Sequence, residues 1–172
     1  PFKCIGLNND NFMNTYYKTQ SLHYDAYRQK MLHGKTPLMF SIPWQKYVNK
    51  RVLLLAGGTG DLIEYFSKWV PDMKEVVISD ISRPMLDMAN ARIRNMGWNN
   101  VRTRVEDVMS ADGLVEEDIG TYDLVICTYS ITMMPNWTKA ITRANKYMNS
   151  DSMFAVADFT LNDEQNMISK YF

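Results

Sequence analysis

The stretch of sequence that decides the fold is RVLLLAGGTGD, residues 51–61. Its apolar run leads directly into a cluster of glycines, and a helical pattern of apolar residues follows at once. This order predicts a buried strand, a tight turn and the start of a helix. Because glycine has no Cβ, such a turn lets backbone N–H groups come close to a ligand. The stretch therefore predicts a binding site at the end of this strand.

The composition is that of a single globular domain with an ordinary core. The chain has 172 residues, of which 46% are apolar and 22% charged, and its formal net charge is zero. A nucleic-acid partner would need a basic face, so none is expected. The cysteines, Cys4 and Cys127, lie far apart without metal-ligand spacing, which predicts no metal site and favours a reducing, cytoplasmic location. No apolar stretch approaches the roughly 20 residues that span a bilayer, so we expect at most peripheral membrane contact.

Strands and helices alternate along most of the chain. Short apolar runs predict strands at 52–56, 75–80, 101–105, 122–128 and 152–159. Helical spacing and capping residues predict helices at 10–33, 61–69 (ended by Pro71), 83–96, 135–148 and 163–171. This alternation predicts an α/β fold, a doubly wound and mostly parallel Rossmann-like sheet. Residues 1–50 are expected to form a helical cap and residues 51–172 the α/β domain, within one structural unit.

Polar residues follow the predicted strands, where a sheet of this kind binds its ligand. Asp80 ends the second strand about twenty residues after the glycine turn, the spacing at which a carboxylate binds a ribose hydroxyl. Together they predict a nucleoside cofactor, the alternative being a plain turn and a helix-capping carboxylate. A dinucleotide site would need glycine where Ile63 stands, and a phosphate-binding P-loop would need a following Gly-Lys-Ser/Thr. Neither pattern is present.

Several motifs resemble class I methyltransferases that use S-adenosylmethionine. Residues 56–62 (AGGTGDL), 79–86 (SDISRPML) and 122–130 (YDLVICTYS) resemble the first motif, second motif and fourth strand of ubiquinone/menaquinone C-methyltransferases. Three further stretches are similar to the methyltransferase domain of betaine lipid synthases: residues 24–28 with 32–35, residues 97–101, and residues 129–135. The resemblance extends from about Tyr24 to Phe159.

This resemblance implies S-adenosylmethionine as the cofactor and assigns a role to each matching residue. The turn residues Gly57, Gly58, Thr59 and Gly60 would line its methionine and ribose parts. Asp80 would bind the ribose hydroxyls and Ile81 would pack on the adenine. Asp107 would accept a hydrogen bond from the adenine amino group, Val108 would offer backbone contacts, and Thr128 would lie below the sulfonium.

The sequence departs from the family pattern at two places inside the opening stretch. An acidic residue usually stands where Leu54 stands, and a glycine where Ala56 stands. The acidic residue helps to organise the glycine loop and the amino-acid end of the cofactor, and Asp61 is the candidate to compensate for it. Arg28 and Lys35 are candidates to pair with the cofactor carboxylate, although two cations near a helix end more often form a solvated face.

The same resemblance predicts methyl transfer to a small or lipid-linked acceptor. A sulfonium already carries its leaving group, so the protein acts mainly by positioning. An amine attacks directly, whereas a carbon nucleophile needs a base. The candidates are Tyr129, Tyr24 and His33, although His33 is more often a surface or cap histidine. The sequence favours an amine of a betaine-lipid head group first and a quinone-precursor carbon second. A non-catalytic partner subunit with the same fold is the alternative of another class.

The last predicted strand stands at an edge of the sheet. The family fold ends in an antiparallel strand pair, which the sequence after this strand does not show. Residues 152–159 would then expose an apolar edge. We therefore expect an oligomer, another partner or a missing segment to cover it.

Overall fold

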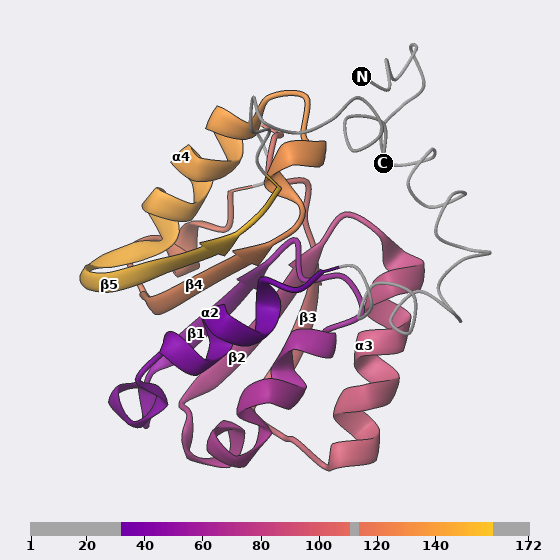
Figure 1. Cartoon of the computed structure of the whole chain (residues 1–172), viewed down its shortest axis with the longest axis vertical. Helices are drawn as coiled ribbons and strands as arrows, with labels where there is room; N and C mark the ends of the chain where they lie inside the picture. Colours follow the sequence, from indigo (N-terminus) through magenta and orange to yellow (C-terminus); the bar gives the residue numbers. More distant parts are fainter. Residues whose placement is uncertain (1–31, 111–113, 160–172) are drawn as a thin grey trace.

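The computed structural model describes residues 32–110 and 114–159 (Figure 1). The elements, with η denoting a 3₁₀ helix, are α2 (Lys35–Ser41), η1 (Trp44–Tyr47), β1 (Arg51–Leu55), η2 (Asp61–Asp72), β2 (Glu75–Asp80), α3 (Arg83–Met96), β3 (Val101–Val105), η4 (Glu116–Asp118), β4 (Tyr122–Thr128), η5 (Ile131–Met133), α4 (Trp137–Tyr147) and β5 (Met148–Ala157). The predicted helix at 163–171 and nearly all of that at 10–33, with Tyr24 and Arg28, lie outside the described residues.

The strands form one parallel sheet, which confirms the predicted fold class. Its five strands stand in the order β3-β2-β1-β4-β5, and every neighbouring pair runs parallel. From β1 the sheet grows through β2 and β3 on one side and through β4 and β5 on the other. The winding direction therefore reverses between β1 and β4, and a sheet of this kind binds its ligand beyond the carboxyl ends of the strands at that point.

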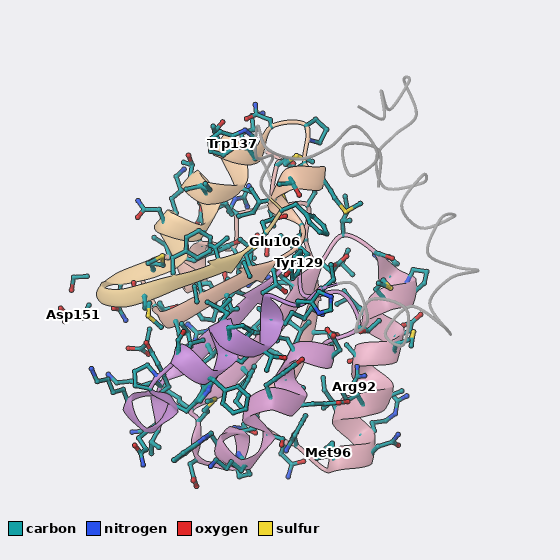
Figure 2. The ribbon with its side chains drawn as sticks, viewed as in Figure 1. Arg92, Met96, Glu106, Tyr129, Trp137 and Asp151 are labelled. Atoms are coloured by element: carbon teal, nitrogen blue, oxygen red, sulfur yellow. The ribbon has the colours of Figure 1, made fainter. Side chains whose placement is uncertain are left out.

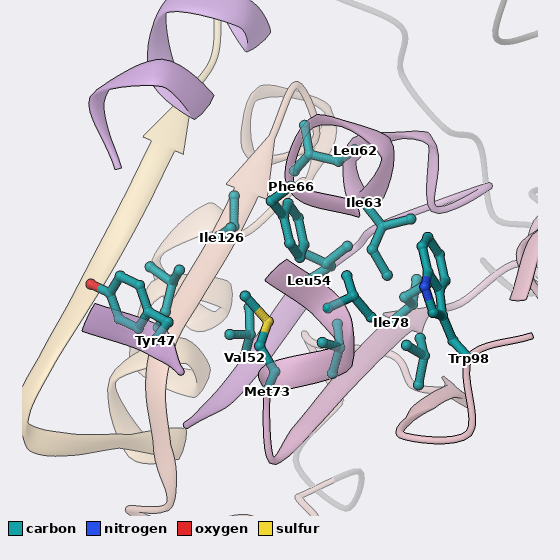
Figure 3. Packing of buried hydrophobic residues seen from close by; sticks show 14 of the residues in the cluster. Tyr47, Val52, Leu54, Leu62, Ile63, Phe66, Met73, Ile78, Trp98 and Ile126 are labelled. Atoms are coloured by element: carbon teal, nitrogen blue, oxygen red, sulfur yellow. The ribbon is translucent and has the colours of Figure 1, made fainter. Parts of the chain in front are cut away.

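Alternate side chains of the central strands fill two cores, one on each face of the sheet. Val52 and Leu54 belong to the larger core, with residues from α2, η1, η2 and α3 (Figure 3). Leu53 and Leu55 point to the opposite face, where α4 and the segment before β4 cover them. Such double burial explains why the middle of β1 is a continuous apolar run instead of an alternating pattern.

The residues before β1 share the larger core with the sheet. Met39 of α2 and Trp44 of η1 are buried, and the Trp44 ring stacks on Phe66 at 4.2 Å between centroids. Figure 1 shows α2 lying in front of the sheet. The division at residue 50 stays a prediction, but the described part of the predicted cap packs as one unit with the α/β domain.

Two predicted element boundaries were wrong. The segment after the glycine turn is a 3₁₀ helix that continues through Pro71 to Asp72, with non-helical backbone at Phe66. This break divides it into two short pieces, so Pro71 does not interrupt a continuous helix. Strand β5 begins at Met148, in the predicted helix 135–148, because Met148 pairs with Tyr122 across an irregularity in the register.

A buried network of charges ties the strands together. Asp118, whose side chain is 1% exposed, accepts hydrogen bonds from Arg51 at 2.7 Å and from the Tyr122 hydroxyl at 2.8 Å. Arg104 pairs with Asp118 and, at 2.6 Å, with Glu106. Burial alone would raise the pKa of Asp118, but the bonds from Arg51 and Tyr122 and the charge of Arg104 hold that pKa below its usual value.

Replacing Asp118 with asparagine should lower the free energy of unfolding at neutral pH by about 3 kcal/mol, because buried guanidinium groups lose their counter-charge. The lowered pKa makes the stabilisation by Asp118 present above the ordinary aspartate pKa of about 4 and lost as the pH falls through its folded-state pKa. D118N should therefore lose less stability than the wild type between about pH 5 and pH 2.

Chemical denaturation across this pH range measures both effects. The matched control is Asp151→Asn, which alters an exposed aspartate in the turn within β5 (Figure 2) and should change neither quantity. If the free energy of unfolding of D118N fell with decreasing pH as steeply as that of the wild type, the role assigned to Asp118 would be contradicted.

Candidate functional site

The glycine turn after β1 has a left-handed backbone. Ala56, Gly58 and Gly60 have φ angles of 51°, 56° and 70°. The N–H of Gly57 donates to the carbonyl of Ser79 in β2 at 2.8 Å, and the N–H of Gly60 donates to the carbonyl of Gly57 at 3.0 Å. The turn is therefore compact and attached to the neighbouring strand.

The glycines of this turn serve two different purposes. A Cβ on Gly57 would lie 2.9 Å from Cγ2 of Ile78, and one on Gly60 would lie 2.8 Å from Cδ1 of the same side chain. These two glycines thus let the turn pack closely on β2. A Cβ on Gly58 would meet only Met85 at 3.5 Å and the Asp80 carboxylate at 4.0 Å. Among the three, Gly58 has the least crowded surroundings, next to the predicted ribose-binding acid.

Asp80 holds the turn in place. One oxygen of its carboxylate accepts a hydrogen bond from Gly58 N and the other from Ser82 N, each at 2.8 Å. A carboxylate has about four acceptor positions, so it can accept several hydrogen bonds at once. The residue predicted to bind ribose therefore also positions the backbone of the glycine turn.

The turn forms without an acid at position 54. Leu54 is 1% exposed and belongs to the larger core. Arg92 of α3 instead donates to the carbonyl of Thr59 and pairs with Glu64 of η2 at 2.7 Å (Figure 2). Asp61, which directly follows the turn, pairs with the Lys35 ammonium at 2.5 Å. Arg92 was not among the sequence-predicted residues, because no local pattern marks a contact 33 residues away.

The other predicted cofactor residues lie at the same edge of the sheet. Ile81 follows β2, Asp107 and Val108 follow β3, and Thr128 ends β4. The Asp107 carboxylate accepts a hydrogen bond from Met109 N at 2.8 Å, and the Val108 side chain is buried. The structure thus gathers these residues with the turn, while their individual contacts with a cofactor stay predictions.

Tyr129 connects the end of β4 to the segment before α2. Its φ angle is 52°, its N–H donates to the carbonyl of Ala157 at 2.8 Å, and its hydroxyl accepts a hydrogen bond from Gly34 N at 2.7 Å. The side chain is buried and its ring lies 4.9 Å from that of Phe159. A structural role is therefore evident, and the catalytic role of Tyr129 stays a prediction.

Two buried hydroxyls next to Asp80 in sequence, those of Ser79 and Ser82, find no hydrogen-bond partner within residues 32–110 and 114–159. Buried polar groups are nearly always paired, so each exception needs an explanation. Ser82 occupies the N-cap position of α3, as predicted, but its side chain makes no capping bond.

Two surface hollows lie away from this edge. One, of about 570 Å³, lies at the amino ends of β1, β2 and β3, and the other, of about 330 Å³, lies between α2, η1 and η2. Neither borders Asp80 or the glycine turn. Within the described residues, no three acidic, histidine or cysteine side chains are grouped to hold a metal ion, and no helix has the length and apolar character to cross a membrane.

A parallel sheet with a reversed strand order, a glycine turn after β1 and an acid at the end of β2 are features of Rossmann-like nucleoside-binding folds, the class that includes the class I methyltransferases. The match of a family model to residues 24–172 shows that the chain belongs to the ubiE/COQ5 methyltransferase family. S-adenosylmethionine is the cofactor that this membership indicates, and the site residues fit it.

Relatives that are similar in sequence include ubiquinone/menaquinone biosynthesis C-methyltransferases. This chain is 29% identical over 115 residues to the one from Haemophilus ducreyi and 34% identical over 110 residues to the one from Enterobacter sp.. These matches cover 64% and 63% of this chain but 42% of each relative. The chain therefore matches less than half the length of these relatives.

Solved structures share the fold at low identity. YcgJ from Bacillus subtilis matches with a TM-score of 0.62 and 20% identity, covering 77% of this chain and 53% of that one. A putative methyltransferase in complex with the Haloferax volcanii Trm112 activator matches with a TM-score of 0.69 and 12% identity, covering 84% and 59%.

Ala56→Gly should raise the free energy of unfolding by about 1 kcal/mol, because a Cβ is disfavoured at a φ of 51°. The matched control is Ala91→Gly in α3, where the same substitution should lower stability by about 0.5–1 kcal/mol. Chemical denaturation of both variants checks the opposite signs. A destabilised A56G protein would contradict the left-handed geometry of the turn.

Proposed function

We propose that this chain binds S-adenosylmethionine and transfers its methyl group to a ring carbon of a lipid-linked quinone precursor. The observation that carries the proposal is the hydrogen bond from Gly58 N to the Asp80 carboxylate. It places an acid beside the glycine turn after β1, at the carboxyl edge of the sheet and next to the point between β1 and β4 where the strand order reverses. Of the two acceptors that the sequence favoured, the family match supports the quinone precursor. A betaine-lipid amine finds no such support.

Each side of the site has a separate task in this proposal. Asp80 accepts hydrogen bonds from the ribose hydroxyls, and Ile81 and Asp107 contact the adenine. The glycine turn and Thr128 hold the remaining part of the cofactor. When bound, the cofactor supplies an activated methyl group with its own leaving group. The residues around it orient that group and exclude water.

The acceptor side needs a base if carbon is methylated. A phenolic ring becomes strongly nucleophilic at carbon when its hydroxyl loses a proton, so a base must lie within hydrogen-bond reach. Tyr129 is the candidate in the described part of the chain, and Tyr24 is the second candidate. Because a quinone precursor resides in a bilayer, the proposal includes peripheral membrane contact from the cytoplasmic side.

Calorimetric titration with S-adenosylmethionine and S-adenosylhomocysteine tests the cofactor. Asp80→Ala should weaken binding by about 1.5–3 kcal/mol, the range for a hydrogen bond to a charged group. The matched control is Asp87→Ala, an exposed acid on α3, which should bind as the wild type does. Thermal unfolding of D80A separates loss of the ligand contact from loss of the turn. Absence of wild-type binding at millimolar ligand would overturn the proposal.

A labelled methyl group on the cofactor distinguishes the acceptors. Incubation with a demethylated quinol and, separately, with a primary amine head group should give a methylated quinol alone, identified by mass spectrometry. Methylation of the amine alone would overturn the choice of acceptor. Tight cofactor binding without transfer to either compound would favour the non-catalytic partner subunit.

A further inference from the structure

Lys35 and Asp61 form an ion pair at the end of the glycine turn. The Lys35 ammonium lies 2.5 Å from the Asp61 carboxylate, and the side chains are only 9% and 19% exposed. Lysine is rarely buried, because removing an ammonium from water costs several kcal/mol unless it is paired. Lys35 therefore does not belong to a solvated face, which was the commoner expectation from the sequence.

The pair occupies a defined place along the carboxyl edge of the sheet. On one side of the turn, Gly58 is bound to Asp80 at the end of β2. On the other side, Asp61 follows Gly60 and contacts Lys35, whose neighbour Gly34 is bound to Tyr129 at the end of β4. The contacts thus lead from β2 across β1 to β4, with the predicted ribose site at one end and the ion pair toward the other.

We propose that Lys35 and Asp61 bind the amino-acid end of S-adenosylmethionine, with Lys35 facing its carboxylate and Asp61 its ammonium. This inference rests on the proposed cofactor. A zwitterion needs a cation and an anion close together, and this pair supplies both. The residue at the usual acidic position cannot contribute, because Leu54 is buried in the apolar core.

The two groups of the pair can each bind an additional partner. An ammonium has three donor hydrogens and a carboxylate has two oxygens with several acceptor positions, so each group can keep its present partner and gain another. Partial burial strengthens these contacts by lowering the local dielectric. The pair also holds α2 against η2, which fixes its own position before a ligand arrives.

Comparison of two ligands isolates this contact. S-adenosylhomocysteine has the amino-acid end, whereas 5′-methylthioadenosine has the same nucleoside and a thioether without it. Lys35→Met preserves the side-chain length and removes the charge. In calorimetric titration it should weaken binding of S-adenosylhomocysteine at least about tenfold, the effect of a lost charged hydrogen bond, and change binding of methylthioadenosine less than about twofold.

Two further variants complete the experiment. Lys46→Met alters an exposed lysine in η1 and should leave both affinities unchanged. The double variant K35M/D61N removes both charges together, so no buried charge is left unpaired if K35M alone unfolds. It should bind the two ligands with nearly equal affinity.

The outcomes separate this inference from the proposed function. If K35M and the double variant lost affinity for both ligands equally, the inference would be overturned and the pair would have a purely structural role. Unchanged binding of S-adenosylhomocysteine would overturn it as well. If the wild-type protein binds neither ligand, the proposed cofactor fails, and this inference fails with it.

Discussion

The hydrogen bond from Gly58 N to the Asp80 carboxylate is the contact on which the site depends. It joins the turn after β1 to the end of β2, two points 22 residues apart in sequence, at 2.8 Å. Parallel pairing of β1 with β2 brings the acceptor into place, and the bond from Gly57 N to the Ser79 carbonyl attaches the same turn to β2. The Asp80 carboxylate adds the side-chain contact at Gly58 and is also the group predicted to bind the ribose.

The parts of the fold that follow from local sequence were predictable. The buried runs of β1, β2 and β4 are mostly apolar, and their lengths and flanking turn residues set them apart from helices. The parts that failed depend on distant contacts. The early start of β5 arises from pairing with Tyr122, and the break at Phe66 in η2 has no turn-forming residue to reveal it. Tertiary packing determines both the start of β5 and the break in η2, and neither is visible in the local sequence pattern.

The candidate site divides in the same manner. The glycine turn and Asp80 were recognisable because their spacing along the chain reflects a ligand's dimensions. Arg92 was not, because it acts on the turn from another helix. Lys35 was a candidate for the cofactor carboxylate, but its burial against Asp61 was not predicted. Lys35 shows the difficulty most clearly. Two cations near a helix end more often form a solvated face, and only the approach of η2 buries Lys35 against Asp61.

The departures at positions 54 and 56 have different physical meanings. Leu54 exchanges a polar contact for burial in the core, and the charges that shape the turn come from Asp80, Arg92 and Asp61 instead. Ala56 adopts the left-handed backbone conformation that favours glycine, and its Cβ makes that conformation strained. Neither change prevents the turn from forming. Turnover is a separate question, because it depends on the acceptor side, where Tyr129 already uses its hydroxyl to hold Gly34.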